Sequence, residues 1–319
     1  MVTAPAARPA DGRRRDLAAL RATLLAVLCL AVAGCSVPGS GRTGIVVTTN
    51  ILGDVARAVA GDRAEVTVLM KPGADPHSFG VSARDAARIE EAALLIHNGL
   101  GLEEGVARNV RAAEEQGVPA LAVGAEVDPI PYAGGDTARA PDPHFWTDPV
   151  RMLEAVDVIA DRIVEHVDGI DEAGVRAAAA AYRAEVAELH AHMRGAFARI
   201  PPDRRKLVTN HHVFGYLARR YGFEVVGAVI PSGTTLASPS GSDLKSLADA
   251  VRGAGVRTVF ADSSQPDRLA RVMARETGLD IAVVPLHSES LTGAGGGAPT
   301  YLRMMRANTA AITEGLAAR

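Results

Sequence analysis

The sequence predicts an α/β protein of two Rossmann-like lobes, each a parallel sheet flanked by helices, joined by one long rigid helix. Short apolar runs rich in β-branched residues alternate with helical patterns twice along the chain, as is typical of parallel sheets covered by helices. An Ala-rich helical segment separates the two series. With 319 residues, 48% of them hydrophobic, the chain can bury a core in each lobe.

The N-terminal segment has the pattern of a secretion signal. Three arginines, 13–15, precede an apolar stretch at 22–33, which is too short to span a bilayer as a helix. Small residues then lead to Cys35, as in the lipobox of bacterial lipoproteins, in which the cysteine is acylated. We predict a signal peptide over 1–34, a lipid anchor at Cys35 and a Ser/Gly/Pro tether over 35–44. The alternative is an ordinary signal peptide that happens to contain a cysteine.

The composition after the leader favours a cation-binding protein. The chain without residues 1–34 has 29 basic and 35 acidic side chains, and its only cysteine is Cys35. Mild acidity without clusters of Lys and Arg argues against nucleic acid as a partner. Because no free thiol remains once Cys35 is acylated, any metal site must use His, Asp and Glu.

The N-terminal lobe is predicted over residues 45–168. Its expected strands are 45–49, 65–70, 93–97 and 120–123, and its expected helices are 51–60, 82–90 and one that starts at Leu102. Asp148 is a predicted N-cap and Pro149 suits the first helical position, so a further helix should run from here to about residue 168.

A linker spine helix is predicted within residues 169–202. From Glu172 to Ile200 apolar residues recur every three or four positions, and two prolines, 201 and 202, end the pattern. Roughly 28 helical residues would span about 42 Å, the height of a domain. We therefore expect a stiff connection between the lobes.

The C-terminal lobe is predicted over residues 203–319 and repeats the scheme of the first. Its expected strands are 206–209, 225–230, 257–261 and 281–285, and its expected helices pass through Leu217, start at Ser242 and start at Pro266.

The tripeptide Asp-Pro-His occurs twice in the first lobe, at 75–77 and at 142–144. A proline biases the residue before it towards extended or turn geometry, so His77 and His144 should each sit on a stiff loop. Each aspartate could accept a hydrogen bond from the ring nitrogen that does not bind metal, or it could cap the local turn.

Two further candidates follow strands in the second lobe. His211 comes directly after 206–209, and Glu289 comes shortly after 281–285. Because α/β sheets bind ligands beyond the carboxyl ends of their strands, His77, His144, His211 and Glu289 should meet between the lobes. Three imidazoles and one carboxylate form a set that Zn²⁺ accepts as a tetrahedron. Two rivals remain open, namely His287 for Glu289 and His212 for His211.

From about Ile45 to its end, the chain resembles the ZnuA/TroA-like family of metal-binding proteins that serve ABC importers. The resemblance rests on both Asp-Pro-His motifs, on residues 98–103, and on His211 with the segment 214–222 that follows it. It implies two α/β lobes with the metal between them and His77, His144 and His211 as imidazole ligands. The fourth ligand in the family is commonly Asp, and Glu289 occupies that place here.

The resemblance leaves the metal open. Zinc members often carry a His-rich loop where residues 127–140 here contain no histidine, whereas manganese-type relatives often place a carboxylate where His211 stands. Imidazole suits Zn²⁺ and oxygen ligands suit Mn²⁺, so we predict Zn²⁺, with a manganese- or iron-specific protein as the alternative. Because imidazoles must be neutral to bind metal, affinity should fall below about pH 6.5.

We expect a monomeric binding protein without catalysis, lipid-anchored outside the cell membrane of a bacterium, which hands its ion to an ABC permease. No Gly-Lys pair occurs in the sequence, so a Walker A loop is absent and the ATPase must be a separate chain. An extracytoplasmic zinc hydrolase is the rival from another class and would need an open coordination position on the metal. A surface adhesin is a third possibility.

Overall fold

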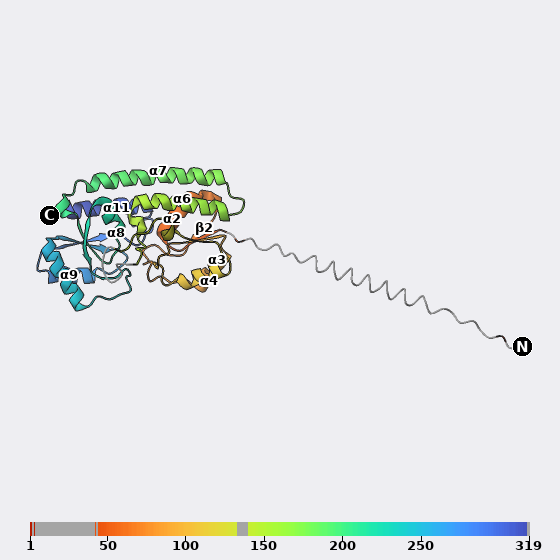
Figure 1. Cartoon of the computed structure of the whole chain (residues 1–319), viewed down its shortest axis with the longest axis horizontal. Helices are drawn as coiled ribbons and strands as arrows, with labels where there is room; N and C mark the ends of the chain where they lie inside the picture. Colours follow the sequence, from red (N-terminus) through yellow and green to blue (C-terminus); the bar gives the residue numbers. More distant parts are fainter. Residues whose placement is uncertain (2, 4–41, 43, 133–139, 318–319) are drawn as a thin grey trace. The chain divides into compact units, whose positions relative to one another are not determined.

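The computed structural model describes residues 1, 3, 42, 44–132 and 140–317 (Figure 1). The chain divides into two compact units, residues 1–42 and 43–319, and the elements below belong to the second. Cys35, nearly all of the predicted leader and most of the tether lie outside the described residues. Among the described helices, none is both long and apolar enough to cross a membrane.

The first sheet is fully parallel, with strand order β2-β1-β3-β4. Its strands are β1 (Ile45–Val47), β2 (Val66–Val68), β3 (Leu94–His97) and β4 (Ala120–Ala122). The accompanying helices are α2 (Asn50–Ala60), α3 (Ala83–Glu91), α4 (Ala107–Glu115) and the short α5 (Val123–Glu126).

The helix predicted from Leu102 begins five residues later, at Ala107, so that prediction is wrong at its start. Gly99, Leu100 and Gly101, just before the predicted start, have φ angles of 76°, 56° and 83°, so the chain leaves β3 through a tight turn. The Glu103 carboxylate accepts hydrogen bonds from the backbone N–H groups of Asn98 and Gly99 and holds the loop in this shape.

The second sheet repeats the topology of the first, with strand order β6-β5-β7-β8 and all strands parallel. Its strands are β5 (Lys206–Thr209), β6 (Glu224–Ala228), β7 (Thr258–Asp262) and β8 (Ala282–Leu286). Its helices are α8 (Gly215–Tyr221), α9 (Gly241–Ala254), α10 (Arg268–Glu276) and α11 (Tyr301–Ala317), the last of which the sequence analysis did not anticipate. The predicted fold class is confirmed.

Two long helices, α6 (Pro149–His166) and α7 (Glu172–Phe197), run side by side; α7 extends over both lobes, with α6 beneath it over the first lobe and α11 over the second (Figure 1). The Asp148 side chain caps α6 by accepting the N–H of Val150, and Pro149 occupies the first turn, as predicted. At 26 residues α7 is about 39 Å long, and it ends at Phe197, before Ile200. Its buried residues recur at helical spacing, and they pack on α2, α6 and α11.

The apolar residues form an inner layer that both lobes share and an outer layer in each lobe. The inner layer joins α2, α6, α7, α8 and α11 to both sheets in one continuous core. The outer layer of the first lobe packs α3 and α4 on its sheet, and that of the second lobe packs α9 and α10 on its sheet. Figure 1 shows α3, α4 and α9 on the side opposite α6 and α7. Among the described residues, the lobes therefore share one apolar core on the α6–α7 side, whereas their outer cores are separate.

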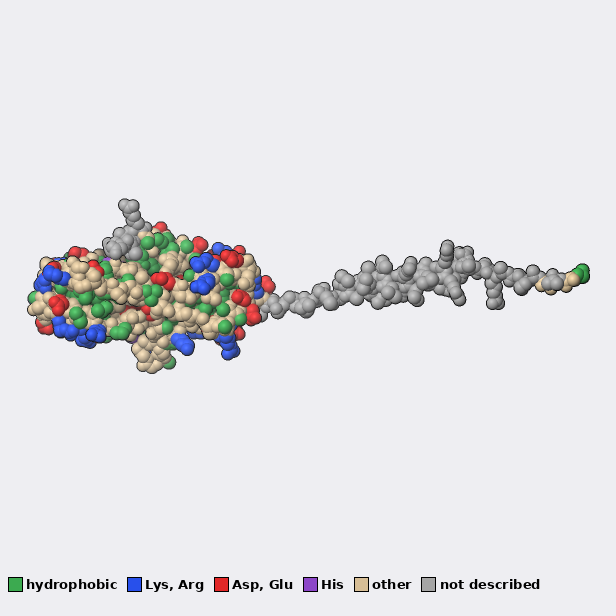
Figure 2. Space-filling model, turned by 90° about the horizontal axis from the view of Figure 1, so that it is seen from below, with side chains coloured by type: hydrophobic (Ala, Val, Ile, Leu, Met, Phe, Trp, Pro, Cys, Tyr) green, Lys and Arg blue, Asp and Glu red, His purple; other side chains and the backbone are tan. Residues whose placement is uncertain are grey.

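The strand order places the reversal of winding between β1 and β3 in one lobe and between β5 and β7 in the other. Loops beyond the carboxyl ends of strands form the ligand crevice of such sheets. On the molecular face in Figure 2, acidic and basic side chains are interspersed rather than gathered by sign.

Candidate metal centre

The structure brings His77, His144, His211 and Glu289 together between the two sheets, at the carboxyl ends of their strands. Each offers one nitrogen or oxygen, and these four atoms all lie within 4.8 Å of one another. The four residues are at most 1% exposed. They come from loops that follow β2, β4, β5 and β8, so two strands of each sheet contribute.

The separations within this group fit a small cation. Glu289 Oε2 lies 3.6 Å from His77 Nε2, and Glu289 Oε1 lies 3.5 Å from His144 Nε2 and 3.3 Å from His211 Nε2. In a tetrahedral zinc site with bonds of about 2.1 Å, neighbouring ligand atoms are about 3.4 Å apart. The carboxylate–imidazole separations therefore match the edge length of such a tetrahedron, with Oε1 facing His144 and His211 and Oε2 facing His77.

The same atoms lack hydrogen-bond partners within the described part of the chain. These are both ring nitrogens of His77 and His211, Nε2 of His144, and both carboxylate oxygens of Glu289. Leaving buried polar atoms unpaired costs about 1–3 kcal/mol for each group. A divalent cation at their centre would satisfy the four inward-facing atoms at once.

The electrostatics of the group keep the three imidazoles in the form that binds metal and make the Glu289 carboxyl easier to protonate. Burial lowers the pKa of His77 to about 4 and that of His144 to about 3, although the Glu289 carboxylate opposes both shifts. Burial also lowers the pKa of His211 and raises the pKa of Glu289 to about 7. Because neutral imidazole is the form that binds a metal ion, the three rings are ready to bind at neutral pH.

The His144 ring is oriented by its own motif. Asp142 Oδ1 accepts the backbone N–H of His144 at 2.9 Å and contacts its Nδ1 at 2.7 Å, which leaves Nε2 to face the centre. The motif is itself held, because Tyr216 Oη donates to the Asp142 carbonyl and Asn98 Nδ2 donates to the Pro143 carbonyl. Such a carboxylate fixes the tautomer and raises the basicity of a metal-binding ring.

The His77 loop is held differently. Asp75 Oδ1 accepts the backbone N–H of His77 at 2.9 Å, and Asp75 Oδ2 accepts from Ser78 Oγ at 3.0 Å, but neither oxygen bonds to the His77 ring. Asp75 Oδ2 also accepts from Thr235 Oγ1 and Gln265 Nε2 in the other lobe. Of the two roles expected for these aspartates, Asp142 performs both and Asp75 only the capping of the turn.

The Glu289 loop depends on contacts that the sequence analysis missed. Trp146 Nε1 donates to the Ser288 carbonyl at 2.9 Å, and Asn50 Nδ2 donates to Ser290 Oγ at 2.8 Å. Asp262 Oδ2 accepts from both the backbone N–H and the hydroxyl of Ser288. The available signals were the serines on both sides of Glu289 and the position of the only tryptophan, two residues after His144.

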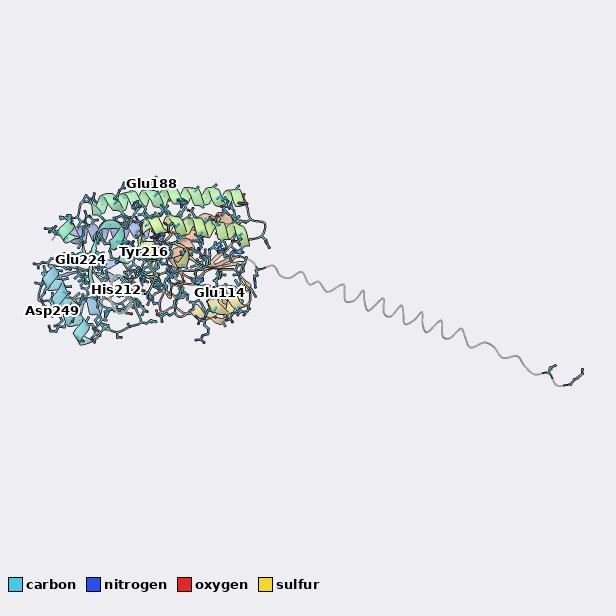
Figure 3. All side chains as sticks on the ribbon, in the orientation of Figure 1. Glu114, Glu188, His212, Tyr216, Glu224 and Asp249 are labelled. Carbon is cyan, nitrogen blue, oxygen red and sulfur yellow. The ribbon has the colours of Figure 1, made fainter. Side chains whose placement is uncertain are left out.

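The two rival histidines lie outside the group. His287 Nδ1 lies 2.9 Å from Ser263 Oγ, and its backbone pairs with the Asn308 amide. His212 donates its backbone N–H to the Ser232 carbonyl, and Figure 3 shows His212 and Tyr216 in the middle of the molecule, between the helices of the two lobes. The geometry thus favours Glu289 over His287 and His211 over His212.

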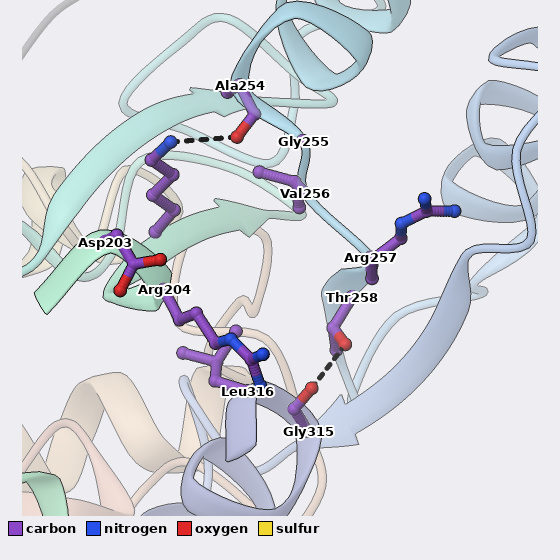
Figure 4. Close-up of a pocket in the computed structure, with 10 residues that line it drawn as sticks. Asp203, Arg204, Ala254, Gly255, Val256, Arg257, Thr258, Gly315 and Leu316 are labelled. Carbon is purple, nitrogen blue, oxygen red and sulfur yellow. Dashed lines mark hydrogen bonds between the residues drawn. The ribbon is translucent and has the colours of Figure 1, made fainter. Parts of the chain in front are cut away.

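A separate cavity of about 310 Å³ lies at the opposite ends of β5 and β7 (Figure 4). Its wall carries Arg204, Lys206 and Arg257 beside a single carboxylate, Asp203. Lys206 Nζ donates to the Ala254 carbonyl, and Thr258 Oγ1 donates to the Gly315 carbonyl. This basic wall disfavours a cation, so the cavity is not a second candidate for the metal.

The chain is similar to several metal-binding proteins. Iron-binding protein YfeA of Yersinia pestis is 31% identical over 271 residues, which is 85% of each chain. Manganese-binding lipoprotein MntA of Halalkalibacterium halodurans is 28% identical over 299 residues, 92% of this chain and 97% of the relative.

Among solved structures, the periplasmic zinc-binding protein TroA of Treponema pallidum superposes with a TM-score of 0.79 at 26% identity, over 86% of this chain and 99% of that one. The Mn-bound periplasmic metal-binding protein of Candidatus Liberibacter asiaticus gives 0.75 at 25% identity, over 85% and 98%. The family model described as zinc-uptake complex component A, periplasmic, matches residues 45–315. The resemblance inferred from the sequence motifs is therefore confirmed, and the chain belongs to the ZnuA family of metal-binding proteins.

Proposed function

We propose that this protein captures a divalent transition-metal ion, Zn²⁺, with His77, His144, His211 and Glu289, and delivers it to an ABC permease driven by a separate ATPase. One observation carries the proposal. Four buried side chains direct unpaired nitrogen and oxygen atoms at a common centre, with separations of 3.3–3.6 Å between the carboxylate and the imidazoles. If the site bound an apolar ligand or no ligand, these buried polar atoms would remain without partners.

The donor set supports zinc over manganese. Three imidazoles with one carboxylate suit Zn²⁺, whereas Mn²⁺ is better served by oxygen donors and higher coordination numbers. The relatives do not agree on a metal, since their names specify iron, manganese or zinc. Manganese or iron is therefore the alternative cargo for the same four residues.

Four protein ligands also support binding without catalysis. A catalytic zinc keeps one position open for water or substrate, whereas in the proposed site Glu289 supplies a fourth protein ligand and all four residues are buried. An ion bound by four buried protein ligands between the lobes has no open position for a substrate, which suits transport rather than catalysis.

We further propose that the protein acts as a monomer anchored outside the bacterial cell membrane by a lipid on Cys35. The sequence before Cys35 and several relatives named as lipoproteins support this proposal. Radiolabelled palmitate should be incorporated by wild type and not by Cys35→Ser, and Cys35→Ser should be released from membranes. Equal incorporation would contradict the assignment of the anchor.

Metal analysis of protein purified from its own host, without chelators or affinity tags, tests the cargo. Competition titrations of Zn²⁺ and Mn²⁺ against a chromogenic chelator should give sub-micromolar binding of Zn²⁺ to wild type. The variants His211→Ala and Glu289→Ala should bind more than 100-fold more weakly, since about 12 kcal/mol shared by four ligands is about 3 kcal/mol each. His211→Glu should narrow the gap between Zn²⁺ and Mn²⁺ by adding an oxygen donor.

His287→Ala and His212→Ala are matched controls, because each removes a histidine one or two residues from a proposed ligand. Both should bind Zn²⁺ within about twofold of wild type. If His287→Ala lost the metal and Glu289→Ala kept it, the fourth ligand would be wrong. If neither ion bound better than micromolar to wild type, the proposed function itself would fail.

A further inference from the structure

The four proposed ligands are not held in equivalent ways. His144 runs into Phe145 and Trp146, His211 runs towards Val213 and Phe214, and Glu289 is followed by Leu291; all of these apolar residues belong to the shared inner core. The loop of His77 instead carries Phe79, which packs with Leu69 and Val81 against the outer core of the first lobe. His77 is thus the ligand attached to a layer that the two lobes do not share.

The Asp75 carboxylate connects the His77 loop to the outer layer of the other lobe. Asp75 Oδ2 accepts hydrogen bonds from Thr235 Oγ1 at 2.6 Å and from Gln265 Nε2 at 2.9 Å. Thr235 lies in the loop that leads to α9, and Gln265 lies in the loop that leads to α10, the two outer helices of the second lobe. We call Asp75, Thr235 and Gln265 the clasp.

We propose that the clasp is a positioning device that holds His77 against the other three ligands, and that the ion leaves when the clasp opens. The inference rests on the proposed metal site. The clasp joins the two outer cores, which share no apolar contact cluster within the described chain, so its hydrogen bonds resist their separation. The contact of Tyr132 Oη with the Gly233 carbonyl is a second polar link to the same loop as Thr235.

The inner side has the opposite character. Trp146 bonds the Ser288 carbonyl, Tyr301 Oη bonds the Trp146 carbonyl, and Arg220 forms an ion pair with Asp148 in which Nη2 and Oδ2 are 2.8 Å apart. These bonds are embedded in or border the continuous core, whose separation would expose large apolar area. Because that exposure costs about 25 cal/mol per Å², the outer side opens first.

The clasp acts on His77 through the turn that Asp75 caps, since only one residue separates Asp75 from His77. The N–H of His77 bonds to Asp75 Oδ1 while the two distant donors bond to Oδ2 of the same carboxylate, and Asp75 is 7% exposed. A displacement of Thr235 and Gln265 is therefore passed through one rigid group to the backbone of the ligand.

The release rate of Zn²⁺ tests the clasp. Zinc-loaded protein is mixed with excess EDTA in a stopped-flow instrument, and Trp146 emission reports release, because this single tryptophan has its ring 5.2 Å from the His144 ring. Thr235→Val and Gln265→Leu remove donors on the far lobe and leave the Asp75 turn intact. Each should speed release threefold or more, and the double variant by about tenfold or more, as expected for hydrogen bonds to a charged group.

Two further variants separate positioning from general damage to the loop. Thr235→Ser keeps the hydroxyl and should restore the wild-type rate. Thr234→Val makes the same change one residue away, where Oγ1 accepts the N–H of Leu236 in the same loop, and it should leave the rate within twofold. Association rates should be unchanged, so that the loss of affinity equals the gain in release rate.

The outcomes are distinguishable. If the double variant releases Zn²⁺ at the wild-type rate, or if Thr234→Val accelerates release as much as Thr235→Val, the clasp is wrong while the metal site stands. If wild type does not bind Zn²⁺ under conditions where circular dichroism shows it folded, the proposed function fails first. A chromogenic chelator in place of EDTA gives the same rates independently of Trp146.

Discussion

The two Asp-Pro-His motifs share a sequence and a backbone turn, yet they serve different ends. In both, Oδ1 of the aspartate accepts the backbone N–H of the histidine at 2.9 Å. Asp142 then adds a contact of 2.7 Å to Nδ1 of its own histidine ring, whereas Asp75 bonds to Thr235 and Gln265 across the lobes. One motif orients a ring, and the other connects two layers of the protein.

The difference shows that a short motif determines its local turn but not the use of its remaining lone pairs. A carboxylate has about four acceptor sites, of which the turn takes one. The rest are assigned by whatever donors the fold brings near, and those donors lie 160 and 190 residues from Asp75. Four predictions sharpen or break this comparison.

The largest effect should come from removing the oriented ring. His144→Ala should weaken Zn²⁺ binding by more than 100-fold, and by more than His77→Ala, because His144 is already held in its binding orientation and loses less entropy on binding. Competition titrations with a chelator measure both. If His77→Ala lost more affinity than His144→Ala, the Asp142 contact would not determine how strongly each ring binds the metal.

The next effect concerns the orienting carboxylate itself. Asp142→Asn keeps an acceptor for Nδ1 but removes the charge, and should lower equilibrium affinity by about 10- to 100-fold. Asp75→Asn leaves the His77 ring nitrogens as they are, so any loss of affinity should come entirely from faster release, with the association rate unchanged. The comparison breaks if both variants lower affinity equally with release unchanged.

Acidification should weaken binding through Glu289, whose two oxygens face His77 and His144 separately. Because burial raises the pKa of Glu289 to about 7, the empty site holds a proton there at lower pH, and the metal must displace it. Apparent affinity should therefore fall about tenfold per pH unit below about 7. The imidazoles of His77 and His144, with pKa values lowered to about 4 and about 3, compete only in stronger acid, and the pKa of His211 is lowered as well.

This differs from the expectation drawn from the sequence, which assigned the loss to histidines near pH 6.5. Glu289→Gln separates the two causes, since it should bind more weakly at pH 7.5 but show little further loss between pH 7 and 5. Isothermal titration at several pH values measures the profile. If the affinity of Glu289→Gln still fell about tenfold per pH unit, the imidazoles rather than Glu289 would cause the pH dependence.

The smallest effect is expected on the inner side. Ser290 Oγ accepts from Asn50 Nδ2 and from the N–H of Gly73, so Ser290→Ala leaves two donors without this partner and should cost about 1–3 kcal/mol. Melting temperature should fall by a few degrees, as measured by calorimetry. Zinc release should stay within about twofold, in contrast to Thr235→Val. If Ser290→Ala released zinc faster without a lower melting temperature, the lobes would open on the inner side and not at the clasp.

The sequence alone determined the features of this protein that depend on local interactions. The alternation of strands and helices, the Asp148-Pro149 helix start and the stiff Asp-Pro-His loops depend on backbone preferences and hydrophobic period, which a few neighbouring residues specify. The positions of His77, His144 and His211 after strands follow from the same patterns. Between Leu102 and Ala107 local reasoning failed, because the side chain of Glu103 holds the preceding loop.

Only the tertiary structure favours Glu289 over His287, since two residues on one loop differ in direction rather than in pattern. It also decided that Asp75 contacts Thr235 and Gln265 and that Trp146 holds the Glu289 loop. These contacts depend on how the two sheets pack around the shared inner core. Tertiary packing brings together residues that are far apart in the sequence, and a local sequence pattern does not indicate which distant donors will contact a given acceptor.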